Sequence, residues 1–308
     1  MNNNKVIKAI RKGRLNSPAG FKELKESFSF ILPLILFVLV FILLPVLGTV
    51  IASSFRDVAF LEKKFILFEN YKQLFLDPRF WQAFRFTLMF IAVSVPLEMV
   101  LGLIFSLILN QNIPLRGCLR ACVLIPWAIP AAISARTWEL IYNYHYGLAN
   151  FLCMKLGICR EPINWLGTNI GAFLSLVISD AWKTTPFVAI ILLAGLQAIP
   201  DELYAQAQVD RANFLQRLYR ITLPLLKPVI IVALLFRTID ALRIFDLIYV
   251  LTRGAPGGAT TSLSLYAYKY FLVSDFGYGS AVSVLLFAIA FVLSIIYVKS
   301  GSFIKEVT

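Results

Sequence analysis

The chain has 308 residues, of which 59% are hydrophobic and 15% charged, and its mean hydropathy is +0.78. A soluble domain would be about half apolar and about one quarter charged, so this composition excludes a soluble globular protein. The net charge of +12 fits contact with anionic lipid better than contact with nucleic acid.

Six apolar runs are each long enough to cross a bilayer as a helix, which takes about 20 residues. They do not alternate apolar with polar residues as β-barrel strands do. We therefore predict an all-α polytopic membrane protein with a basic tail at 1–27 and a six-helix transmembrane domain at 28–308. The predicted spans are 28–52, 86–109, 118–141, 170–196, 225–250 and 279–298.

The segment before the first span is strongly basic. Basic flanks favour the cytoplasmic side of a membrane, so we expect a cytoplasmic N-terminus, and six spans return Lys299 and Lys305 to the same side. The first span starts late and has no small-residue cleavage site, which argues against a cleaved signal peptide. The basic residues of the segment before this span are Lys5, Lys8, Arg11, Lys12, Arg14, Lys22 and Lys25.

Two features between and within the next spans stand out. Residues 69–81 are rich in aromatic side chains and predict a short amphipathic helix at the membrane surface. Pro126 and Pro130 lie four residues apart inside the third span, where they remove backbone hydrogen bonds and break the helix. Such a break either lines a substrate path or serves packing alone.

Ionisable residues occur inside two spans. Span four contains Asp180 and Lys183, and span five contains Arg237, Asp240, Arg243 and Asp246, with alternating sign at spacings of three. Residues three apart share a helix face and can pair, and a charge inside a bilayer costs at least about 2.5 kcal/mol. We expect Asp180 to pair with Lys183 and the other four to neutralise one another. The charges form either a network that fixes helix packing or a polar path for a hydroxyl-rich solute.

The polar segment 197–224 separates spans four and five. Pro200, Asp201 and Glu202 suit the first turn of a helix that continues to Val209, and a second short helix is expected from Asn213 to Arg220. Two short helices between spans offer a rigid docking surface to a soluble partner.

The sequence offers little catalytic chemistry. It has one histidine, His145, and no phosphate-binding loop, so we expect no catalytic residues, no metal site and no cofactor in this chain. Cys118 and Cys122 suit packing. Cys153 and Cys159 lie in a predicted external loop, where a disulfide is permitted, although unpaired thiols are favoured.

Several spaced motifs resemble permease subunits of bacterial ATP-binding-cassette (ABC) sugar importers of the trehalose/maltose type. The polar segment resembles their cytoplasmic coupling loop, known as the EAA loop. The other matching strings are Asn70-Tyr71 with Asp77-Pro78-Arg79-Phe80-Trp81, Leu115-Arg116-Gly117 with Leu124-Ile125-Pro126-Trp127, and Leu251-Thr252-Arg253-Gly254-Ala255-Pro256. The resemblance implies a type I importer permease fold in the plasma membrane. It also implies a second homologous permease, two ATPase copies that bind ATP and Mg, and an extracytoplasmic sugar-binding protein.

The resemblance also implies which residues serve the solute and the ATPase. The expected substrate path comprises Trp127, Asp180, Lys183, Thr184, Phe187 and Arg237, to which the charge pattern of span five adds Asp240. The expected coupling residues are Ala205, Gln206, Ala207, Asp210 and Arg211.

The coupling loop departs from the family pattern in two places. Ala205-Gln206-Ala207 stands where the motif has Glu-Ala-Ala, and Arg211 stands where it has Gly. Either Arg211 keeps right-handed geometry and the bend moves to Asn213, or Arg211 makes a compensating contact with the partner.

Three alternatives remain open at the level of sequence. The importer could carry glycerol phosphate or another polyol, since Lys183 or Arg237 would suit an anion. The chain could be an ion-coupled secondary transporter or channel, which would leave the polar segment without a purpose. A membrane-embedded enzyme lacks any convergent catalytic set.

Overall fold

The computed structural model describes residues 18–112 and 114–301, with side chains from residue 28 onward. The chain divides into two compact units, 1–52 and 53–308, and each is described by itself. Much of the predicted tail, residues 1–17, lies outside the described residues, whereas residues 18–27 already belong to a helix.

The first unit is one helical rod. α2 (Pro18–Val38), a π-helical turn (Leu39–Leu43) and α3 (Leu44–Ser53) follow without a gap. The apolar stretch Phe28–Ser53 is long enough to span a membrane, and none of its most apolar window is buried inside the chain. The first predicted span is therefore a helix whose apolar surface faces lipid or another protein.

The second unit begins with a small hairpin. β1 (Phe55–Arg56) pairs antiparallel with β2 (Lys64–Phe65). The short helix α4 (Glu69–Leu76) follows, as predicted, but it ends before Asp77. Asp77 caps α5 (Pro78–Leu109) by accepting a hydrogen bond from the Arg79 amide at 2.8 Å. The second span thus begins at residue 78 rather than 86, because an Asp-Pro pair favours a helix start.

The third span is broken as predicted. α6 (Arg116–Ala128) and α7 (Ala131–Ile141) meet at an angle of 87°. Ile129 and Pro130 between them have extended ψ angles of 131° and 139°. The helix does not continue through Ile129 and Pro130, since a proline disfavours helical geometry in the residue before it.

The fourth span is the continuous helix α9 (Asn169–Gln197), which follows the short helix α8 (Leu148–Lys155). The side chain of Thr168 caps α9 by accepting from the Gly171 amide at 3.1 Å. α9 packs along α5 at Gly102, where an added Cβ would lie only 2.5 Å from Val188 Cγ1. Small residues at such contacts let helix backbones approach closely in membranes.

The fifth span is shorter than predicted. α10 (Asp201–Val209) and α11 (Phe214–Arg217) form the polar segment, and a π-helical turn (Leu218–Thr222) joins α11 to α12 (Leu223–Leu242). The prediction that this span extends to 250 is wrong. The helix ends at Leu242, and the chain turns before α13 (Asp246–Leu251); within this turn the Ile244 carbonyl accepts from the Ser262 hydroxyl at 2.8 Å.

The chain continues with α14 (Leu263–Leu272) and α15 (Phe276–Ser300). Among the described residues, four helices are long and apolar enough to cross a membrane, and the bent pair α6–α7 makes five. α12, where the fifth span was predicted, is not among these helices, and it carries Lys227, Arg237 and Asp240. The multi-pass helical architecture is confirmed, and the count of six stays a prediction.

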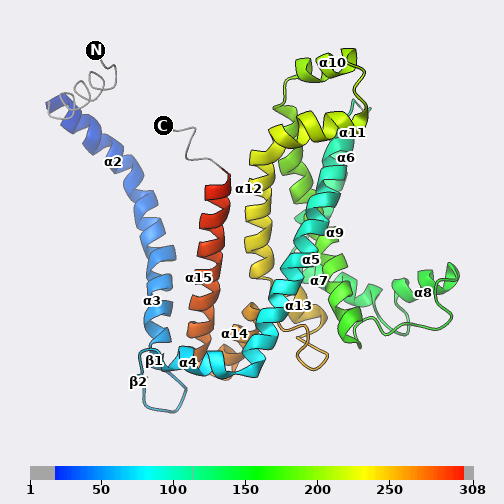
Figure 1. Cartoon of the computed structure of the whole chain (residues 1–308). Helices are drawn as coiled ribbons and strands as arrows, with labels where there is room; N and C mark the ends of the chain where they lie inside the picture. The colour runs from blue at the N-terminus through cyan, green and yellow to red at the C-terminus, as the bar shows by residue number, and fades with distance from the viewer. Residues whose placement is uncertain (1–17, 113, 302–308) are drawn as a thin grey trace. The chain divides into compact units, whose positions relative to one another are not determined.

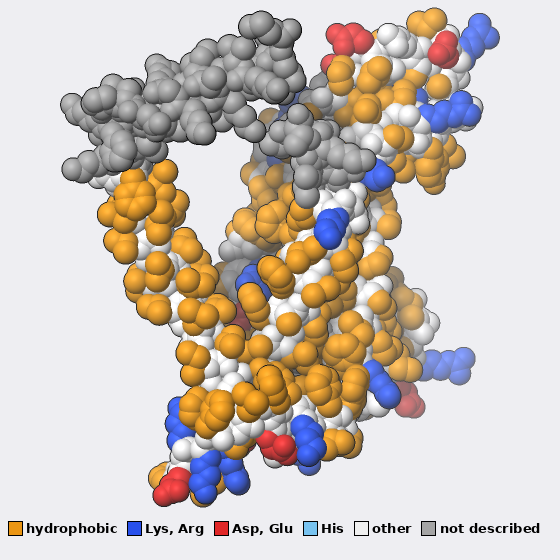
Figure 2. Space-filling view, turned by 60° about the vertical axis from the view of Figure 1, so that its left-hand side comes forward, with side chains coloured by type: hydrophobic (Ala, Val, Ile, Leu, Met, Phe, Trp, Pro, Cys, Tyr) orange, Lys and Arg blue, Asp and Glu red, His pale blue; other side chains and the backbone are white. Residues whose placement is uncertain are grey.

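The second unit has two distinct ends (Figure 1). α10 and α11 lie at one end of its long helices, and α4, α8 and α14 lie at the opposite end. Figure 2 shows hydrophobic side chains over the middle of the visible face, while charged side chains gather along its lower edge and at its upper right. This distribution suits an apolar belt within a bilayer.

Candidate functional site

Arg237 on α12 is the centre of a buried ion-pair cluster. Its Nε donates to Glu98 Oε2 at 2.6 Å, its Nη2 to Asp180 Oδ2 at 3.1 Å and its Nη1 to Asp240 Oδ2 at 2.7 Å. The side chains of Arg237 and Glu98 are 2% and 0% exposed. Burying a charge is tolerated only with a partner, so this cluster fixes α5, α9 and α12 to one another.

Two further groups complete the cluster. The Ser94 hydroxyl lies 2.7 Å from Glu98 Oε1 and 3.1 Å from Asp180 Oδ2, and its single proton serves one of them at a time. Arg243 Nη2 donates to Asp240 Oδ1 at 3.3 Å. Asp240 therefore joins a buried cation to an exposed one.

The expected pairing of these charges is partly wrong. Asp240 does pair with Arg237 and Arg243, as the spacing predicts. Asp180 pairs with Arg237 on the neighbouring helix, not with Lys183 on its own helix. Asp246 lies beyond the end of α12 and starts α13.

Lys183 instead donates hydrogen bonds to the backbone at the break in the third span. Its ammonium donates to the backbone carbonyls of Trp127, at 3.2 Å, and Ile129. The last carbonyls of a helix have no partner within the helix, and a cation there also meets the negative end of the helix dipole. Lys183 thus stabilises the end of α6 at the point where the helix stops.

An aromatic surface adjoins this break. The rings of Trp127 and Phe187 stack at 5.6 Å with an interplanar angle of 13°, and Phe236 meets Phe187 edge-on at 6.3 Å. Trp127 is 49% exposed. Such a face suits the apolar side of a sugar ring, while charged groups suit its hydroxyl edges.

A cavity of about 420 Å³ lies between α9, α12 and the turn that follows α12. Five of the seven predicted path residues line it, and Trp127 and Phe187 stack nearby without lining it. Their role as a sugar site stays a prediction. The cavity's charged and hydroxyl-bearing lining residues are Asp180, Lys183, Thr184, Arg237, Asp240, Arg243 and Asp246.

Glu98 and Ser94 are not among the residues predicted from the sequence. Glu98 is an isolated acidic residue in the middle of the apolar run 86–109, and an intramembrane carboxylate is a functional or structural signal by itself. The position of Glu98 in an apolar run could therefore have been noticed in the sequence. Its pairing with Arg237, 139 positions away, could not.

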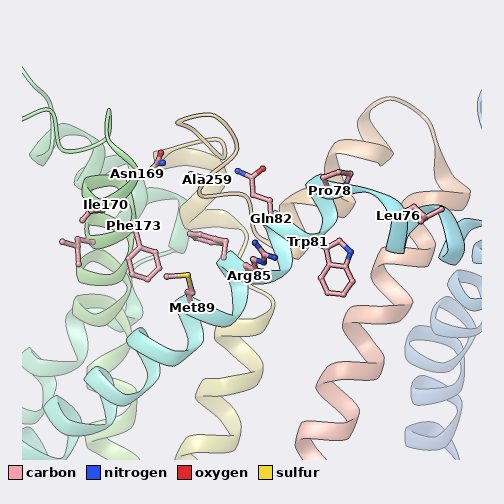
Figure 3. Close-up of a pocket in the computed structure, with 12 residues that line it drawn as sticks. Leu76, Pro78, Trp81, Gln82, Arg85, Met89, Asn169, Ile170, Phe173 and Ala259 are labelled. Atoms are coloured by element: carbon pink, nitrogen blue, oxygen red, sulfur yellow. The ribbon is translucent and has the colours of Figure 1, made fainter.

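A second pocket lies at the end of α5 that carries Pro78 (Figure 3). It encloses about 690 Å³ and is lined mainly by apolar side chains of α5 and α9, including Trp81, Met89 and Phe173, with Arg85 as its charged member. It is separate from the charged cavity, and none of the predicted path residues lines it.

The polar segment folds as predicted over α10 but differs at its bend. Arg211 adopts the left-handed region with φ +53°, so the first of the two alternatives, right-handed geometry with the bend moved to Asn213, is wrong, and the second, a compensating contact with the partner, stays a prediction. Its amide donates to the Gln208 carbonyl at 3.0 Å, and the Ala212 amide to the Ala207 carbonyl at 2.9 Å. This is a Schellman turn in which Arg211 takes the place that Gly usually fills. Such geometry costs a non-glycine residue about 1–2 kcal/mol.

The second helix of the segment has a strong start. Asn213 accepts from the Gln216 amide at 2.8 Å, and the Gln216 side chain accepts from the Asn213 amide at 2.9 Å. This capping box starts α11, which runs through the π-helical turn into α12 instead of ending near Arg220.

The exposed face of this segment differs from the expected one. Ala205, Gln206, Asp210 and Arg211 are exposed, as docking would require. Ala207 is 8% exposed and packs within the chain, so it offers little surface to a partner, and its coupling role stays a prediction. The structure adds large exposed apolar side chains that we did not predict, namely Val209, Phe214, Leu215 and Tyr219.

The opposite end is held by a hydroxyl cluster. The Tyr266 hydroxyl donates to Asp77 Oδ2 at 2.6 Å and lies 3.1 Å from the Tyr278 hydroxyl. Burial, together with the hydrogen bond to Asp77, raises the pKa of Tyr266, so the phenol stays protonated. It ties α14 to the first turn of α5.

The described residues contain no group of three or more His, Cys, Asp or Glu side chains arranged to hold a metal ion.

Comparison with known proteins gives a consistent result. A sequence model of the family described as the binding-protein-dependent transport system inner membrane component matches residues 98–302. The trehalose/maltose transport system permease protein MalF of Thermococcus litoralis is 54% identical over 293 residues, covering 95% of this chain and 99% of that protein. The trehalose transport system permease protein SugA of Mycobacterium tuberculosis is 41% identical over 237 residues, covering 76% and 74%.

The fold also has a counterpart among solved structures. A chain in the crystal structure of a bacterial ABC transporter involved in the import of the acidic polysaccharide alginate superposes with a TM-score of 0.80. It is 24% identical, and the match covers 91% of this chain and 97% of that chain. At this identity the likeness concerns the fold alone.

Proposed function

The chain belongs to the family of binding-protein-dependent transport system inner membrane components, and on that premise we propose that it is the permease subunit of an ATP-driven importer for a disaccharide of the trehalose or maltose type. The premise itself makes the chain a multi-pass membrane transport subunit rather than an enzyme. The solute, the partners and the orientation are the proposal.

The observation that carries the proposal is the charged cavity next to an aromatic stack. Asp240, Arg243 and Asp246 offer hydrogen-bonding groups to hydroxyls in a space of about 420 Å³, and the Trp127–Phe187 stack offers an apolar face beside it. This volume is within the range of small-molecule sites, about 300–1,000 Å³. The relatives named for trehalose and maltose support the same class of solute.

An anionic solute, such as glycerol phosphate, is a weaker candidate. Each of the three nitrogens of Arg237 already donates to a carboxylate, and Lys183 is engaged by two backbone carbonyls. Neither of these two cations is free to neutralise a phosphate, and Arg243, the third cation of the lining, donates to Asp240. The cavity therefore favours a neutral polyhydroxyl compound.

The energy for transport would come from a partner. The segment formed by α10 and α11 docks into an ABC ATPase, of which two copies serve this chain and a second, homologous permease. The exposed apolar side chains of Val209 and Leu215 support this assignment, because exposed apolar patches mark interaction sites. ATP and Mg bind to the ATPase, and an extracytoplasmic sugar-binding protein delivers the solute.

Orientation follows from the docking surface. α10 and α11 face the cytoplasm with both termini, and α4, α8 and α14 face outward. In a cysteine-free background, Glu161→Cys should react with a membrane-impermeant thiol reagent in intact cells, and Gln208→Cys should not. The reverse labelling pattern would overturn the orientation.

Affinity purification of the chain in mild detergent tests the proposal. We expect an ABC ATPase and a second permease of the same family to co-purify. A homodimer without an ATPase would favour the ion-coupled transporter instead.

A further inference from the structure

The chain beyond α8 folds back onto the helix that it leaves. The Gly157 amide donates to the Met154 carbonyl at 3.0 Å, and the Ile158 amide to the Cys153 carbonyl at 2.9 Å. With Gly157 at φ +70°, this is a Schellman turn. It directs the next residue, Cys159, back toward Cys153.

The two cysteines meet at this turn. The Cys159 amide donates to the Cys153 carbonyl at 3.3 Å, so the two backbones lie side by side. The neighbouring Cys153 thiol, together with burial, raises the pKa of Cys159 to about 11. A disulfide requires Cα atoms within about 4.4–6.8 Å and side chains that point at one another. Both residues are free thiols in the structure, and the turn brings their backbones into hydrogen-bond contact.

The two cysteine pairs of the chain lie on opposite sides of the membrane in the proposed orientation. α8 lies at the end opposite α10 (Figure 1), which is the outer side in the orientation that we propose above, and the inference rests on that orientation. Disulfides form and persist outside the cytoplasm. Cys118 and Cys122 lie near the start of α6, which is close to α10 and α11 in Figure 1.

We propose that Cys153 and Cys159 form a structural disulfide on the outer face of the protein. The oxidant is a disulfide of an extracytoplasmic thiol oxidoreductase. The Cys159 thiolate, the more exposed of the two, attacks one sulfur of that disulfide and forms a mixed disulfide. The Cys153 thiolate then attacks the Cys159 sulfur and releases the oxidoreductase as a dithiol, so two thiols lose two protons and two electrons in total.

The bond would fasten a segment that is organised around Asn150. The Asn150 amide nitrogen donates to the Tyr144 and Ile163 carbonyls at 3.1 Å each, and its oxygen accepts from the Trp165 indole at 2.8 Å. α8 and the turn after it thus join the end of α7 to the start of α9. A disulfide between Cys153 and Cys159 closes the turn covalently and keeps it attached to α8.

Thiol mapping of the full-length protein in its complex tests the proposal. Cells are treated with a membrane-permeant maleimide, and the complex is purified and digested without reductant. We expect the Cys153–Cys159 peptide to be unlabelled and about 2 Da lighter than its dithiol form, while Cys118 and Cys122 are labelled. Maleimide on both Cys153 and Cys159 in a host that has an extracytoplasmic thiol oxidoreductase would overturn the proposal.

Two controls separate the possible failures. In the first control, the purified complex is incubated with a mixture of glutathione and glutathione disulfide. Cys153 and Cys159 should oxidise in this mixture even if the host lacks the oxidoreductase. If both thiols stay reduced there, the proposal is overturned. Oxidation of Cys118–Cys122 instead would overturn both the proposal and the orientation. Reduced Cys153 and Cys159 in a complex that contains the ATPase would overturn the disulfide alone.

A stability measurement provides a matched comparison. The double variant Cys153→Ser/Cys159→Ser should melt several degrees lower than the wild type, and the difference should vanish when both are measured in dithiothreitol. Cys118→Ser/Cys122→Ser should melt as the wild type does in both conditions. Equal melting of the first variant and wild type without reductant would contradict a stabilising disulfide.

Discussion

Replacement of Arg237 by Met tests the structural role of the buried ion-pair cluster. The substitution keeps much of the side-chain volume but removes the cation that serves Glu98, Asp180 and Asp240. Glu98 is then left with the Ser94 hydroxyl and no opposite charge, at a site where its side chain is 0% exposed.

The expected cost follows from this burial. Removing one partner of a buried ion pair typically costs about 3–5 kcal/mol, because a charge is left uncompensated. At about 2–4 °C for each kcal/mol, the midpoint of thermal unfolding should fall by roughly 10 °C. Arg243→Met provides the matched control: Arg243 is 70% exposed and pairs with the same Asp240, and an exposed pair contributes about 0–1 kcal/mol.

The assay heats the detergent-solubilised complex and measures the fraction that remains monodisperse by fluorescence-detected size exclusion. Arg237→Met in a Glu98→Gln background should lose less stability than Arg237→Met alone, because fewer charges are left unpaired. Equal midpoints for Arg237→Met and Arg243→Met would refute the reasoning.

Three further predictions concern the solute and the ATPase. Trp127→Ala should weaken uptake of the cognate sugar, with a loss of about 1–3 kcal/mol of contact, while assembly stays intact; unchanged uptake would show that the residue serves packing. Val209→Asp should uncouple ATP hydrolysis from transport in reconstituted vesicles without affecting membrane insertion, and full coupling would remove Val209 from the docking surface. Arg211→Gly should raise the stability of the complex by up to about 1 kcal/mol, because Gly adopts a positive φ without strain; a lower melting midpoint would mean that the Arg211 side chain makes a contact that Gly cannot replace.

Much of this fold is predictable because its signals are local. The apolar runs and the break at Pro130 each depend on a few adjacent residues, and the structure confirms helices in these runs and the break. The helix start at Asp77-Pro78 is equally local, although we placed the start of the second span at residue 86. The boundary of α12 was not predictable in this way. The turn that follows it is held by the Ser262 hydroxyl, which donates to the Ile244 carbonyl from 18 residues further along the chain.

The candidate site shows the same division. Spacing along α12 correctly pairs Asp240 with Arg237 and Arg243. Spacing along α9 wrongly paired Asp180 with Lys183. The spacing of residues on one helix carries no information about a stronger partner on a neighbouring helix. The choice is made by tertiary packing, which brings Arg237 to Asp180 and turns Lys183 to the end of α6.

Transport by the purified system tests the central claim most directly. The chain would be reconstituted in proteoliposomes with its co-purifying permease and ATPase, and uptake of radiolabelled trehalose and maltose would be measured with the sugar-binding protein outside and ATP inside. The account predicts uptake that requires both ATP and the binding protein and that is insensitive to collapse of ion gradients. Uptake that proceeds without ATP and stops when an ion gradient is removed would contradict it.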